Sequence, residues 1–570
     1  MEFNQKRKKT ETGGQVESVL AELGRAVDAS ETDKARDILK AGAEAGIEAF
    51  LSNHPDRIDQ MFDYARIMFR LERVEDACRW YRAVLNTEEN FGAYNELGCI
   101  YQSQGRLSDA VSCLKKAVEL RPHRTEMWAN IGKALFEAGE TEEGMAWLVR
   151  AVEQDPQNAA VHSVFLFCLH HLPELDTEDL FDYHRQWAEV HACRPFRTAF
   201  ENNPDPERKL RIGYLSADFR RHSAAYFFES LLDGHDRGLY EIYAYGNVAW
   251  PDYFTDRIRG KCDRYRNIYG MTDAEADELM VNDGIDILVD LMGHTGENRM
   301  TLLARKPAPL IISYLAINTT AVPAVDYRFT DRYLNPPETQ QYYTEQFIYL
   351  PDCHLCYRPV DFAPGMVSLP ALRNGYVTFG SFNNHLKLHP HVLSVWSNIL
   401  NRCEGARLVL KFGAGNDPFV RNRILGRFKK SGIDSERVTI LGRKSPQEHL
   451  EMYNEIDIAL DTWPFNGCTT TCEALWMGVP VVSMIGEDFV SREGLSILKK
   501  IGLDFFAVSE QEEYINRALA LASNIDSLAG IRNSMRARIA SSGLCYARGF
   551  TRGVEQAYRE IWRKWCSEQL

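Results

Sequence analysis

The sequence has no long hydrophobic run and no surplus of positive charge. Its longest apolar stretch, residues 308–317, includes Pro309 and Ser313 and is far shorter than the ~20 residues of a membrane span. A formal net charge of -14 leaves no excess of Lys and Arg to neutralise nucleic-acid phosphates. These absences predict a soluble protein with neither a membrane nor a nucleic acid as its partner.

A regular cysteine framework is also absent. The 13 cysteines are odd in number and scattered, and Cys99, Cys113 and Cys168 fall inside amphipathic segments, which indicates reduced thiols and a cytoplasmic location. Cys353 and Cys356 have the spacing of half a zinc knuckle, but no second pair at comparable spacing accompanies them. We therefore interpret this pair as structural.

The N-terminal segment, residues 1–14, lacks the hydrophobic core of a signal peptide. It is polar and carries a basic cluster from Lys6 to Lys9. We expect it to be a disordered tail.

Residues 58–156 repeat themselves, because equivalent residues such as Gly98 and Gly132 are 34 positions apart. Small residues at the expected helix crossing, large ones beside them and a closing proline all recur, and this pattern resembles the tetratricopeptide repeat. The matching positions are Tyr94, Leu97, Gly98, Tyr101, Ala110, Leu114, Ala117 and Pro122 in one period and Trp128, Ile131, Gly132, Leu135, Gly144, Leu148, Ala151 and Pro156 in the next.

Helical hairpins of this kind stack into a solenoid whose concave surface usually binds an extended peptide. We expect a helical domain over residues 15–200, with a protein or peptide partner on the concave face of residues 58–156. The alternative is that the array serves as a scaffold or as the platform of a homodimer.

After Pro204 and Pro206 the pattern changes to short apolar runs that alternate with helical segments. That alternation predicts βαβ units and parallel sheets, and the remaining length exceeds one doubly wound sheet. We expect two α/β domains, over residues 207–365 and 374–540, and a C-terminal helix over residues 541–570 that packs back on them. In such sheets ligands bind beyond the carboxyl ends of the strands.

One strand end carries a candidate phosphate site. After the apolar segment that ends at Leu460, a turn containing Gly467 leads to a helix that starts with Thr469, Thr470 and Thr471. Free N–H groups, the helix dipole and Thr hydroxyls favour a diphosphate at such a helix start. The alternative is an ordinary capping box, since Glu473 follows Thr470 by three residues.

Two further strand ends carry titratable groups. Asp218 and His222 follow the first apolar run of the α/β region, and His222 is a candidate general acid or base. Lys387 follows the first strand of the second domain, where a departing diphosphate would need a cation. Capping and solvation are the plainer roles for these residues.

Together these loops resemble the protein O-linked glycosyltransferases that include the O-GlcNAc transferases and the SPINDLY proteins. The segments Ile285–Thr295, Arg305–Pro309, Pro351–Cys353 and Phe379–Asn384 are also similar to family segments. The resemblance implies a GT-B enzyme with two Rossmann-like lobes. It also implies metal-independent, inverting transfer from a nucleotide sugar to Ser or Thr, and the sequence agrees in having no Asp-x-Asp triplet.

Site roles follow from the same resemblance, position by position. Lys387 would stabilise the diphosphate, and His222 matches the family's active-site histidine, with Asp218 beside it. No metal ligands and no cofactor are implied. The implied donor-binding residues are Asn384, Lys387, His449, Cys468, Thr469, Thr470 and Glu473.

Two positions depart from the O-GlcNAc transferase pattern. Those enzymes usually carry His before the paired Thr and Asp three residues after that pair, whereas this chain has Cys468 and Glu473 and looks closer to the SPINDLY branch. The loop Leu315–Thr320 also differs from the family's usual Gly-Tyr-Pro. We expect UDP-GlcNAc as the donor, with GDP-fucose as the alternative.

The sequence therefore predicts a protein O-glycosyltransferase acting on Ser or Thr of a protein. Two other hypotheses remain open. One is a tetratricopeptide binding module with an inactive transferase region, and the other is a nucleotide-sugar enzyme that acts on carbohydrate or lipid.

Overall fold

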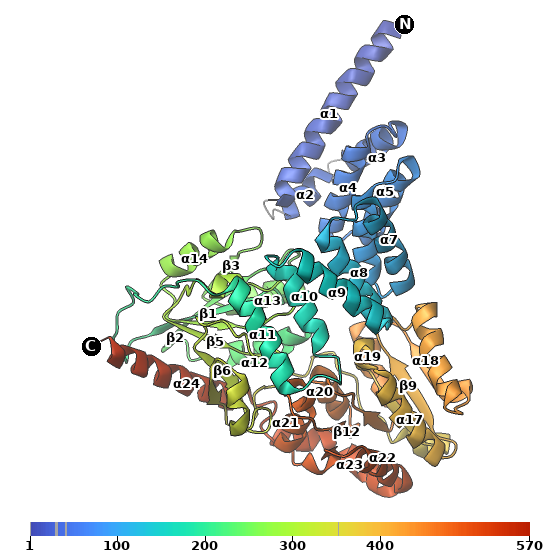
Figure 1. The fold of residues 1–570 in the computed structure, drawn as a ribbon, viewed down its shortest axis with the longest axis vertical. Coiled ribbons are helices and arrows are strands. Elements are labelled where there is room, and N and C mark those ends of the chain that lie inside the picture. The colour runs from blue at the N-terminus through green and yellow to red at the C-terminus, as the bar shows by residue number, and fades with distance from the viewer. Residues whose placement is uncertain (1, 29–31, 40–42, 352, 570) are drawn as a thin grey trace. The chain divides into compact units, whose positions relative to one another are not determined.

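The computed structural model describes residues 2–28, 32–39, 43–351 and 353–569. Asp352, which belongs to one of the segments similar to the family, lies outside the described residues. The chain forms two compact units, residues 1–134 and 135–570, and each is described by itself (Figure 1).

The first unit is helical. In the second repeat hairpin, a side chain at Gly98 would lie 2.6 Å from Cγ of Leu114, so only a residue without Cβ allows this helix crossing. Leu97, Ala110 and Ala117 are buried beside it, as the repeat predicts. The helices are α1 (Glu2–Asp28), α2 (Thr32–Ile38), α3 (Glu44–Asn53), α4 (Ile58–Arg70), α5 (Val74–Thr87), α6 (Phe91–Ser103), α7 (Leu107–Leu120) and α8 (Thr125–Ala138).

The N-terminal segment differs from the expected disordered tail, because residues 2–14 form the first half of α1. This segment is rich in Glu, Gln, Lys and Arg, which are good helix formers. Further along the same helix, Val16, Leu20 and Leu23 recur at helical spacing and are buried. Low hydrophobicity, which suggested disorder, does not oppose a helix that is anchored by its second half.

The second unit begins with three helices and continues into a seven-stranded sheet whose neighbouring strands are all parallel. The strand order is β3-β2-β1-β4-β5-β6-β7. The helices are α9 (Thr141–Gln154), α10 (Ala159–Leu169) and α11 (Thr177–His191), and the strands are β1 (Leu210–Ser216), β2 (Tyr240–Gly246), β3 (Arg264–Asn267), β4 (Ile287–Asp290), β5 (Leu310–Ser313), β6 (Tyr327–Thr330) and β7 (Gln346–Tyr349).

The second sheet has six parallel strands in the order β10-β9-β8-β11-β12-β13. In both sheets the order reverses once, between β1 and β4 and between β8 and β11, which is the doubly wound arrangement. These are the two Rossmann-like lobes that the sequence predicted. The strands are β8 (Thr378–Ser381), β9 (Arg407–Lys411), β10 (Val438–Leu441), β11 (Ile458–Leu460), β12 (Val481–Met484) and β13 (Ala507–Val508).

Helices cover both lobes. Figure 1 shows α17 and α18 beside β9, and α22 packs against β11 and β12. The helices of the two lobes are α12 (Ser223–Gly234), α13 (Tyr253–Lys261), α14 (Asp273–Asn282), α15 (Met300–Leu303), α16 (Pro370–Asn374), α17 (Pro390–Arg402), α18 (Pro418–Lys430), α19 (Pro446–Glu451), α20 (Thr469–Trp476), α21 (Glu493–Lys500), α22 (Gln511–Ser523), α23 (Ile525–Ser541) and α24 (Ala547–Glu568).

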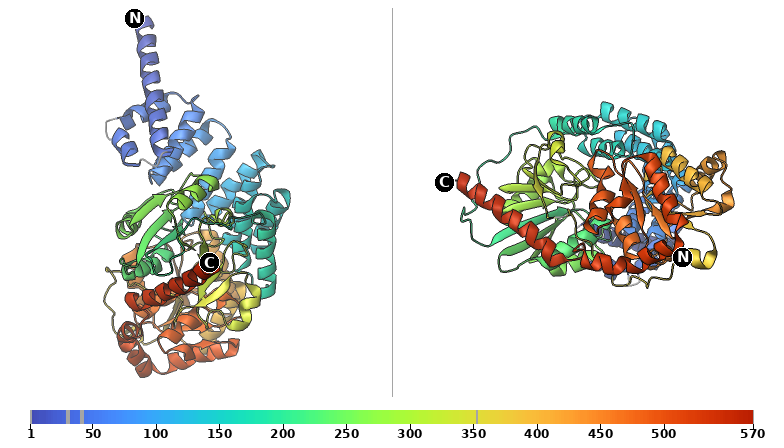
Figure 2. Two further views of the ribbon diagram at one scale, coloured as in Figure 1. Left: turned by 90° about the vertical axis from the view of Figure 1, so that its left-hand side faces the viewer. Right: turned by 90° about the horizontal axis from the view of Figure 1, so that it is seen from below.

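The last helix, α24, returns to the first lobe and lies beside its strands in both views of Figure 2. Val554 and Trp562 join the buried core around Ile212. The Tyr558 hydroxyl lies 2.9 Å from that of Tyr214, so the helix is also fixed by a buried polar contact. The chain thus crosses from the first lobe to the second and back.

Among the described residues, no helix is both long and apolar enough to cross a membrane.

Candidate functional site

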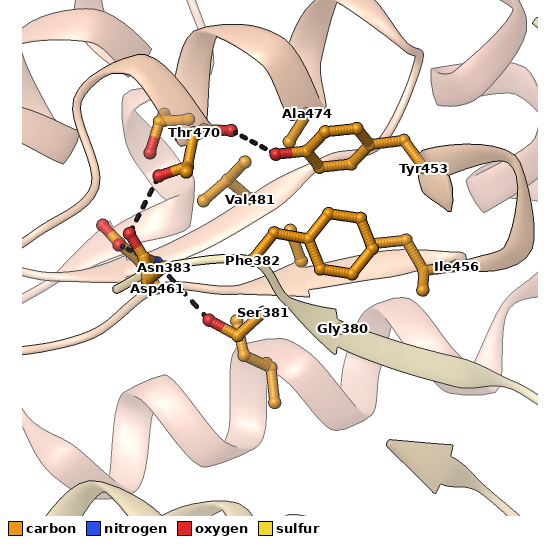
Figure 3. A pocket seen from close by; sticks show the side chains of 13 residues that line it. Gly380, Ser381, Phe382, Asn383, Tyr453, Ile456, Asp461, Thr470, Ala474 and Val481 are labelled. Atoms are coloured by element: carbon orange, nitrogen blue, oxygen red, sulfur yellow. Dashed lines mark hydrogen bonds between the residues drawn. The ribbon is translucent and has the colours of Figure 1, made fainter. Parts of the chain in front are cut away.

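A pocket lies at the point where the strand order of the second lobe reverses. Its lining comes from the carboxyl ends of β8 and β11, from the start of α20 and from Tyr453. Figure 3 shows Asn383 and Thr470 directed toward each other across it, with Phe382 and Tyr453 on the other side. A doubly wound sheet binds its ligands at this position.

Asp461, the residue after β11, organises the turn that leads to α20. Its buried carboxylate accepts hydrogen bonds from the backbone N–H groups of Thr462 (2.9 Å) and Gly467 (2.7 Å) and from the hydroxyl of Ser483 (2.7 Å). Burial raises the pKa of Asp461 to about 6, and these hydrogen bonds oppose that rise. Gly467 must be a glycine, because a Cβ there would lie 2.4 Å from Oγ1 of Thr470.

The start of α20 is not capped as the capping-box alternative requires. Cys468 is the N-cap residue and makes no side-chain hydrogen bond to the helix. The Thr470 hydroxyl donates to Oδ1 of Asn383 (2.8 Å), and the Glu473 carboxylate faces Nε2 of His449 (2.9 Å). Both members of the predicted box are therefore engaged elsewhere, and the first turn of α20, which contributes Thr470 and Thr471 to the pocket lining, has no side-chain cap.

Lys387 brings a cation to the same turn. It ends the short helix η3 (His385–Lys387), and its Nζ donates to the Asn466 carbonyl oxygen at 2.6 Å. The ammonium lies 3.8 Å from the centre of the Phe465 ring, which is a close cation–π contact. Burial lowers the pKa of Lys387 to about 8, against the attraction of Asp461, Cys468 and Glu493.

His449 and Glu473 lie next to residues that line the pocket. Their side chains are only 15% and 14% exposed. His449 packs near Phe382 and Tyr453, with ring centroids 5.8 and 5.5 Å away. Its Nδ1 is buried and has no hydrogen-bond partner among the described residues.

In the first lobe, His222 precedes α12 and lies against Asp218. Nδ1 of His222 is 3.1 Å from Oδ2 of Asp218 and 3.3 Å from the backbone N of Ala224. One nitrogen cannot donate to the carboxylate and accept from the amide at the same time. When Nδ1 donates to Asp218, Nε2 of the neutral ring carries a lone pair, as a general base requires.

The His222 ring is partly accessible. Loss of hydration lowers the pKa of His222, the charge of Asp218 opposes that shift, and 44% of the side chain is exposed. Tyr226, four residues further along, connects this region electrostatically to the other lobe. Burial and then the charge of the Glu473 carboxylate raise the pKa of Tyr226.

Most of the sequence-predicted donor residues lie in one region of the second lobe, but Asn384 is not among the residues that line the pocket. Asn384 is exposed and accepts a hydrogen bond from the Leu386 N–H, so its side chain caps η3. Its neighbour Asn383 lines the pocket and contacts Thr470 and Asp461. Sequence reasoning missed Asn383, Asp461 and Tyr453, although the end of an apolar strand at Leu460 signalled Asp461.

The loop Leu315–Thr320, which departs from the family pattern, is buried and hydrogen bonded. Arg328 donates to the carbonyl oxygens of Ala316 and Asn318, at 2.6 Å each. The Glu345 carboxylate accepts from the hydroxyls of Thr319 (2.5 Å) and Thr320 (2.6 Å). The unusual sequence of this loop is thus matched by internal partners.

One group in the described part of the chain has the spacing of metal ligands, namely Asp331, Cys353 and His354. The hydroxyl of Ser496 lies among them, 2.5 Å from Oδ2 of Asp331, 3.4 Å from Nδ1 of His354 and 3.5 Å from Sγ of Cys353. A metal ion would need that central position. The group is therefore a hydrogen-bonded cluster around a hydroxyl, and Cys356, the second member of the expected pair, is not part of it.

Comparisons with known proteins agree with this arrangement. The family model for glycosyl transferase family 41 matches residues 187–358 and 367–554, which include both sheets, and a tetratricopeptide repeat model matches residues 101–164. A solved structure of a mutant Thermobaculum terrenum O-GlcNAc transferase superposes with a TM-score of 0.86 and 36% sequence identity, covering 90% of this chain and 98% of that one.

Curated relatives point the same way. An Arabidopsis thaliana protein named probable UDP-N-acetylglucosamine-peptide N-acetylglucosaminyltransferase SPINDLY is 38% identical over 426 residues, which cover 74% of this chain and 46% of that protein. The protein of the same name from Solanum lycopersicum is 37% identical over 422 residues, covering 73% and 45%. The chain spans about half the length of the curated relatives it matches. By the family match over both sheets, the chain belongs to glycosyl transferase family 41.

Proposed function

We propose that this protein transfers a sugar from a nucleotide sugar to a Ser or Thr hydroxyl of a protein. The observation that carries the proposal is the uncapped start of α20 beside Lys387. Two independent sources of positive potential, a helix N-terminus and a buried ammonium, converge where a diphosphate would leave.

The donor would lie over the pocket of the second lobe. Its diphosphate would take hydrogen bonds from the first turn of α20 and a salt bridge from Lys387. Thr469 would add its hydroxyl, and Thr470 would do so when its hydroxyl turns away from Asn383. Glu473, held by His449, is the candidate partner of the ribose, and the His449 ring is the candidate neighbour of the base. Cys468 contributes its backbone to the turn.

The acceptor hydroxyl would approach from the first lobe. Its oxygen attacks the anomeric carbon, the bond from that carbon to the diphosphate breaks, and the nucleoside diphosphate leaves with the bonding pair. The hydroxyl proton passes to Nε2 of His222, whose other nitrogen donates to Asp218. A single displacement of this kind inverts the anomeric centre, and the leaving charge is balanced by Lys387 and α20.

UDP-GlcNAc is the donor that the relatives favour, since their names specify UDP-N-acetylglucosamine and a peptide. GDP-fucose is the second candidate, because Cys468 and Glu473 stand where the O-GlcNAc transferases carry His and Asp. The acceptor would bind the concave face of residues 58–156, and we propose that neither a metal nor another cofactor takes part.

Mass spectrometry of a protein pool incubated with this enzyme and either nucleotide sugar tests the proposal. We expect a mass increment of N-acetylhexosamine or of deoxyhexose on Ser or Thr, undiminished by EDTA. If neither donor yields a product and neither UDP nor GDP raises the melting temperature, the protein is a binding module with an inactive transferase region.

A further inference from the structure

A buried ionic cluster joins the two lobes next to the proposed diphosphate site. Asp331 directly follows β6 of the first lobe, and His354 lies in the segment that leads from β7 to the second lobe. Glu493 and Ser496 are on α21 of the second lobe. These four residues are between 0% and 7% exposed, so their charges must be balanced within the cluster.

His354 lies between two carboxylates, one from each lobe. Its Nδ1 is 3.3 Å from Oδ2 of Asp331, and its Nε2 is 3.3 Å from Oε2 of Glu493. A neutral imidazole has one N–H group, so one carboxylate would then face a lone pair. Carboxylates at both nitrogens therefore select the doubly protonated, positively charged ring.

The electrostatics agree with that geometry. Burial disfavours a charged ring, but Glu493 and Asp331 overcome it and hold the pKa of His354 well above its usual range. Burial likewise disfavours an ionised Asp331, yet hydrogen bonds from His354 and Ser496 lower the pKa of Asp331 to about 2. Both groups of this pair are charged at neutral pH.

Glu493 extends the cluster to the donor site. Burial and the negative charge of Glu493 hold the pKa of Cys468 well above its usual range, and Cys468 is the N-cap residue of α20. Asn466 connects Glu493 with Lys387. Its side-chain oxygen accepts from the backbone N–H of Gly494, which follows Glu493, at 3.3 Å, and its carbonyl oxygen accepts from Lys387 at 2.6 Å. The Glu493 carboxylate also attracts Lys387. A negative charge thus lies close to the position proposed for a diphosphate, where it would repel the phosphate and compete for the lysine.

We propose that His354 is a positioning residue that joins the lobes and neutralises Glu493, so that Lys387 and the start of α20 remain available to the donor diphosphate. The inference rests on the proposed function. Without the imidazolium, Glu493 becomes a buried carboxylate whose charge attracts Lys387, and the lysine pairs with it instead of with the phosphate.

Binding of UDP, GDP, uridine and guanosine by calorimetry tests this role in full-length variants. His354→Gln is expected to weaken nucleoside diphosphate binding about tenfold, or about 1.4 kcal/mol, while nucleoside binding is unchanged. Adding Glu493→Gln removes the uncompensated charge and is expected to restore diphosphate binding to within about threefold. Arg402→Gln, which breaks an exposed ion pair with Glu512 in the same lobe, is the matched control.

The outcomes separate the explanations. Unchanged diphosphate binding in His354→Gln, or an equal loss for diphosphates and nucleosides that Glu493→Gln does not reverse, would overturn the inference in favour of a packing role. Stoichiometric zinc in the purified protein that is absent from His354→Gln would overturn it in favour of a metal site. If the unmodified protein binds neither UDP nor GDP, the proposed function itself fails, and this inference fails with it.

Discussion

The two lobes share one strand order but differ in how the helix after the site-forming strand begins. In the first lobe, the residue before α12 is His222, whose ring nitrogen already lies against Asp218 and the Ala224 amide. In the second lobe, the residue before α20 is Cys468, whose side chain caps nothing. The same topology thus presents a titratable side chain at one switch point and free backbone donors at the other.

The comparison shows that topology fixes where a ligand can bind, whereas the helix start decides what is bound. At the start of α12, the capping residue His222 offers its side chain for proton transfer. The start of α20 has no side-chain cap, so it offers backbone N–H groups and the helix dipole to an anion. On this account the acceptor chemistry belongs to the first lobe and the donor diphosphate to the second.

Removing the cation of the second lobe is expected to have the largest effect. Lys387→Ala should lower kcat/KM for transfer at least about 10³-fold, because the ammonium stabilises charge that develops on the leaving diphosphate. Steady-state kinetics with the active donor measure this. Lys429→Ala, an exposed lysine on α18, should leave the rate unchanged. Near-normal turnover of Lys387→Ala would contradict the proposal that the second lobe stabilises the leaving diphosphate through Lys387.

Removing the titratable group of the first lobe should affect only the chemical step. His222→Ala is expected to lower kcat about 10²-fold or more while UDP or GDP binding stays within about twofold, since general bases contribute rate rather than donor affinity. Asp218→Asn should act in the same direction. A parallel loss of UDP or GDP affinity in His222→Ala would contradict the assignment of acceptor chemistry to the first lobe and donor binding to the second.

The turn that directs α20 can be broken by one methyl group. Gly467→Ala would bring Cβ within 2.7 Å of Oδ1 of Asn383 as well as onto Thr470, so we expect a loss of about 1–3 kcal/mol of stability together with weakened UDP and GDP binding. Gly426→Ala is the control, because nothing lies within 4 Å of its Cβ position on α18. Thermal denaturation of both variants is the measurement, and equal melting temperatures would contradict the turn's geometry.

The pH dependence of donor binding follows from the pKa of Lys387, which burial lowers to about 8 in the donor-free protein. Below that pH the ammonium is charged. Above it, binding must take up a proton, so UDP or GDP affinity should fall up to about tenfold per pH unit. Uridine and guanosine affinity should not follow this slope, and calorimetry between pH 7 and pH 9 compares the two. A flat profile for the diphosphates would argue against Lys387 as their partner.

Substitution of the neighbouring asparagines is expected to change nucleotide affinity least, but it shows which of the two, Asn383 or Asn384, contacts the donor. Asn383→Ala removes a 2.8 Å hydrogen bond to Thr470 inside the pocket and should weaken nucleotide binding about fivefold to tenfold. Asn384→Ala changes an exposed cap of η3 and should have an effect below about twofold. Equal losses of nucleotide affinity in the two variants, or a larger loss in Asn384→Ala, would support Asn384, the residue that the sequence indicated.

Much of the architecture was predictable because it depends on local patterns. The 34-residue spacing of Gly98 and Gly132 indicated the helical hairpins, and apolar runs such as the one ending at Leu460 indicated parallel strands. The loops at strand ends indicated Lys387, His222 and the threonines of α20. The doubly wound order then follows from short right-handed connections between parallel strands.

The rest depends on partners that are distant in sequence. Thr470 and Glu473 satisfy the capping-box pattern, and only Asn383 and His449, contributed by other elements, draw both side chains away from it. The sequence alone does not show which of the adjacent residues Asn383 and Asn384 lines the pocket. The conformation of the turn after β8 places Asn383 there. The role proposed for His354 depends on its contact with Glu493 on α21, which is distant in sequence, and no local pattern connects the two residues.

The most direct test of the account is a crystal structure of the complete chain with UDP or GDP bound. We expect diphosphate oxygens within hydrogen-bond distance of the first-turn N–H groups of α20 and of Nζ of Lys387, with His222 free on the opposite lobe. A diphosphate bound at the start of α12, or one that contacts neither α20 nor Lys387, would contradict it.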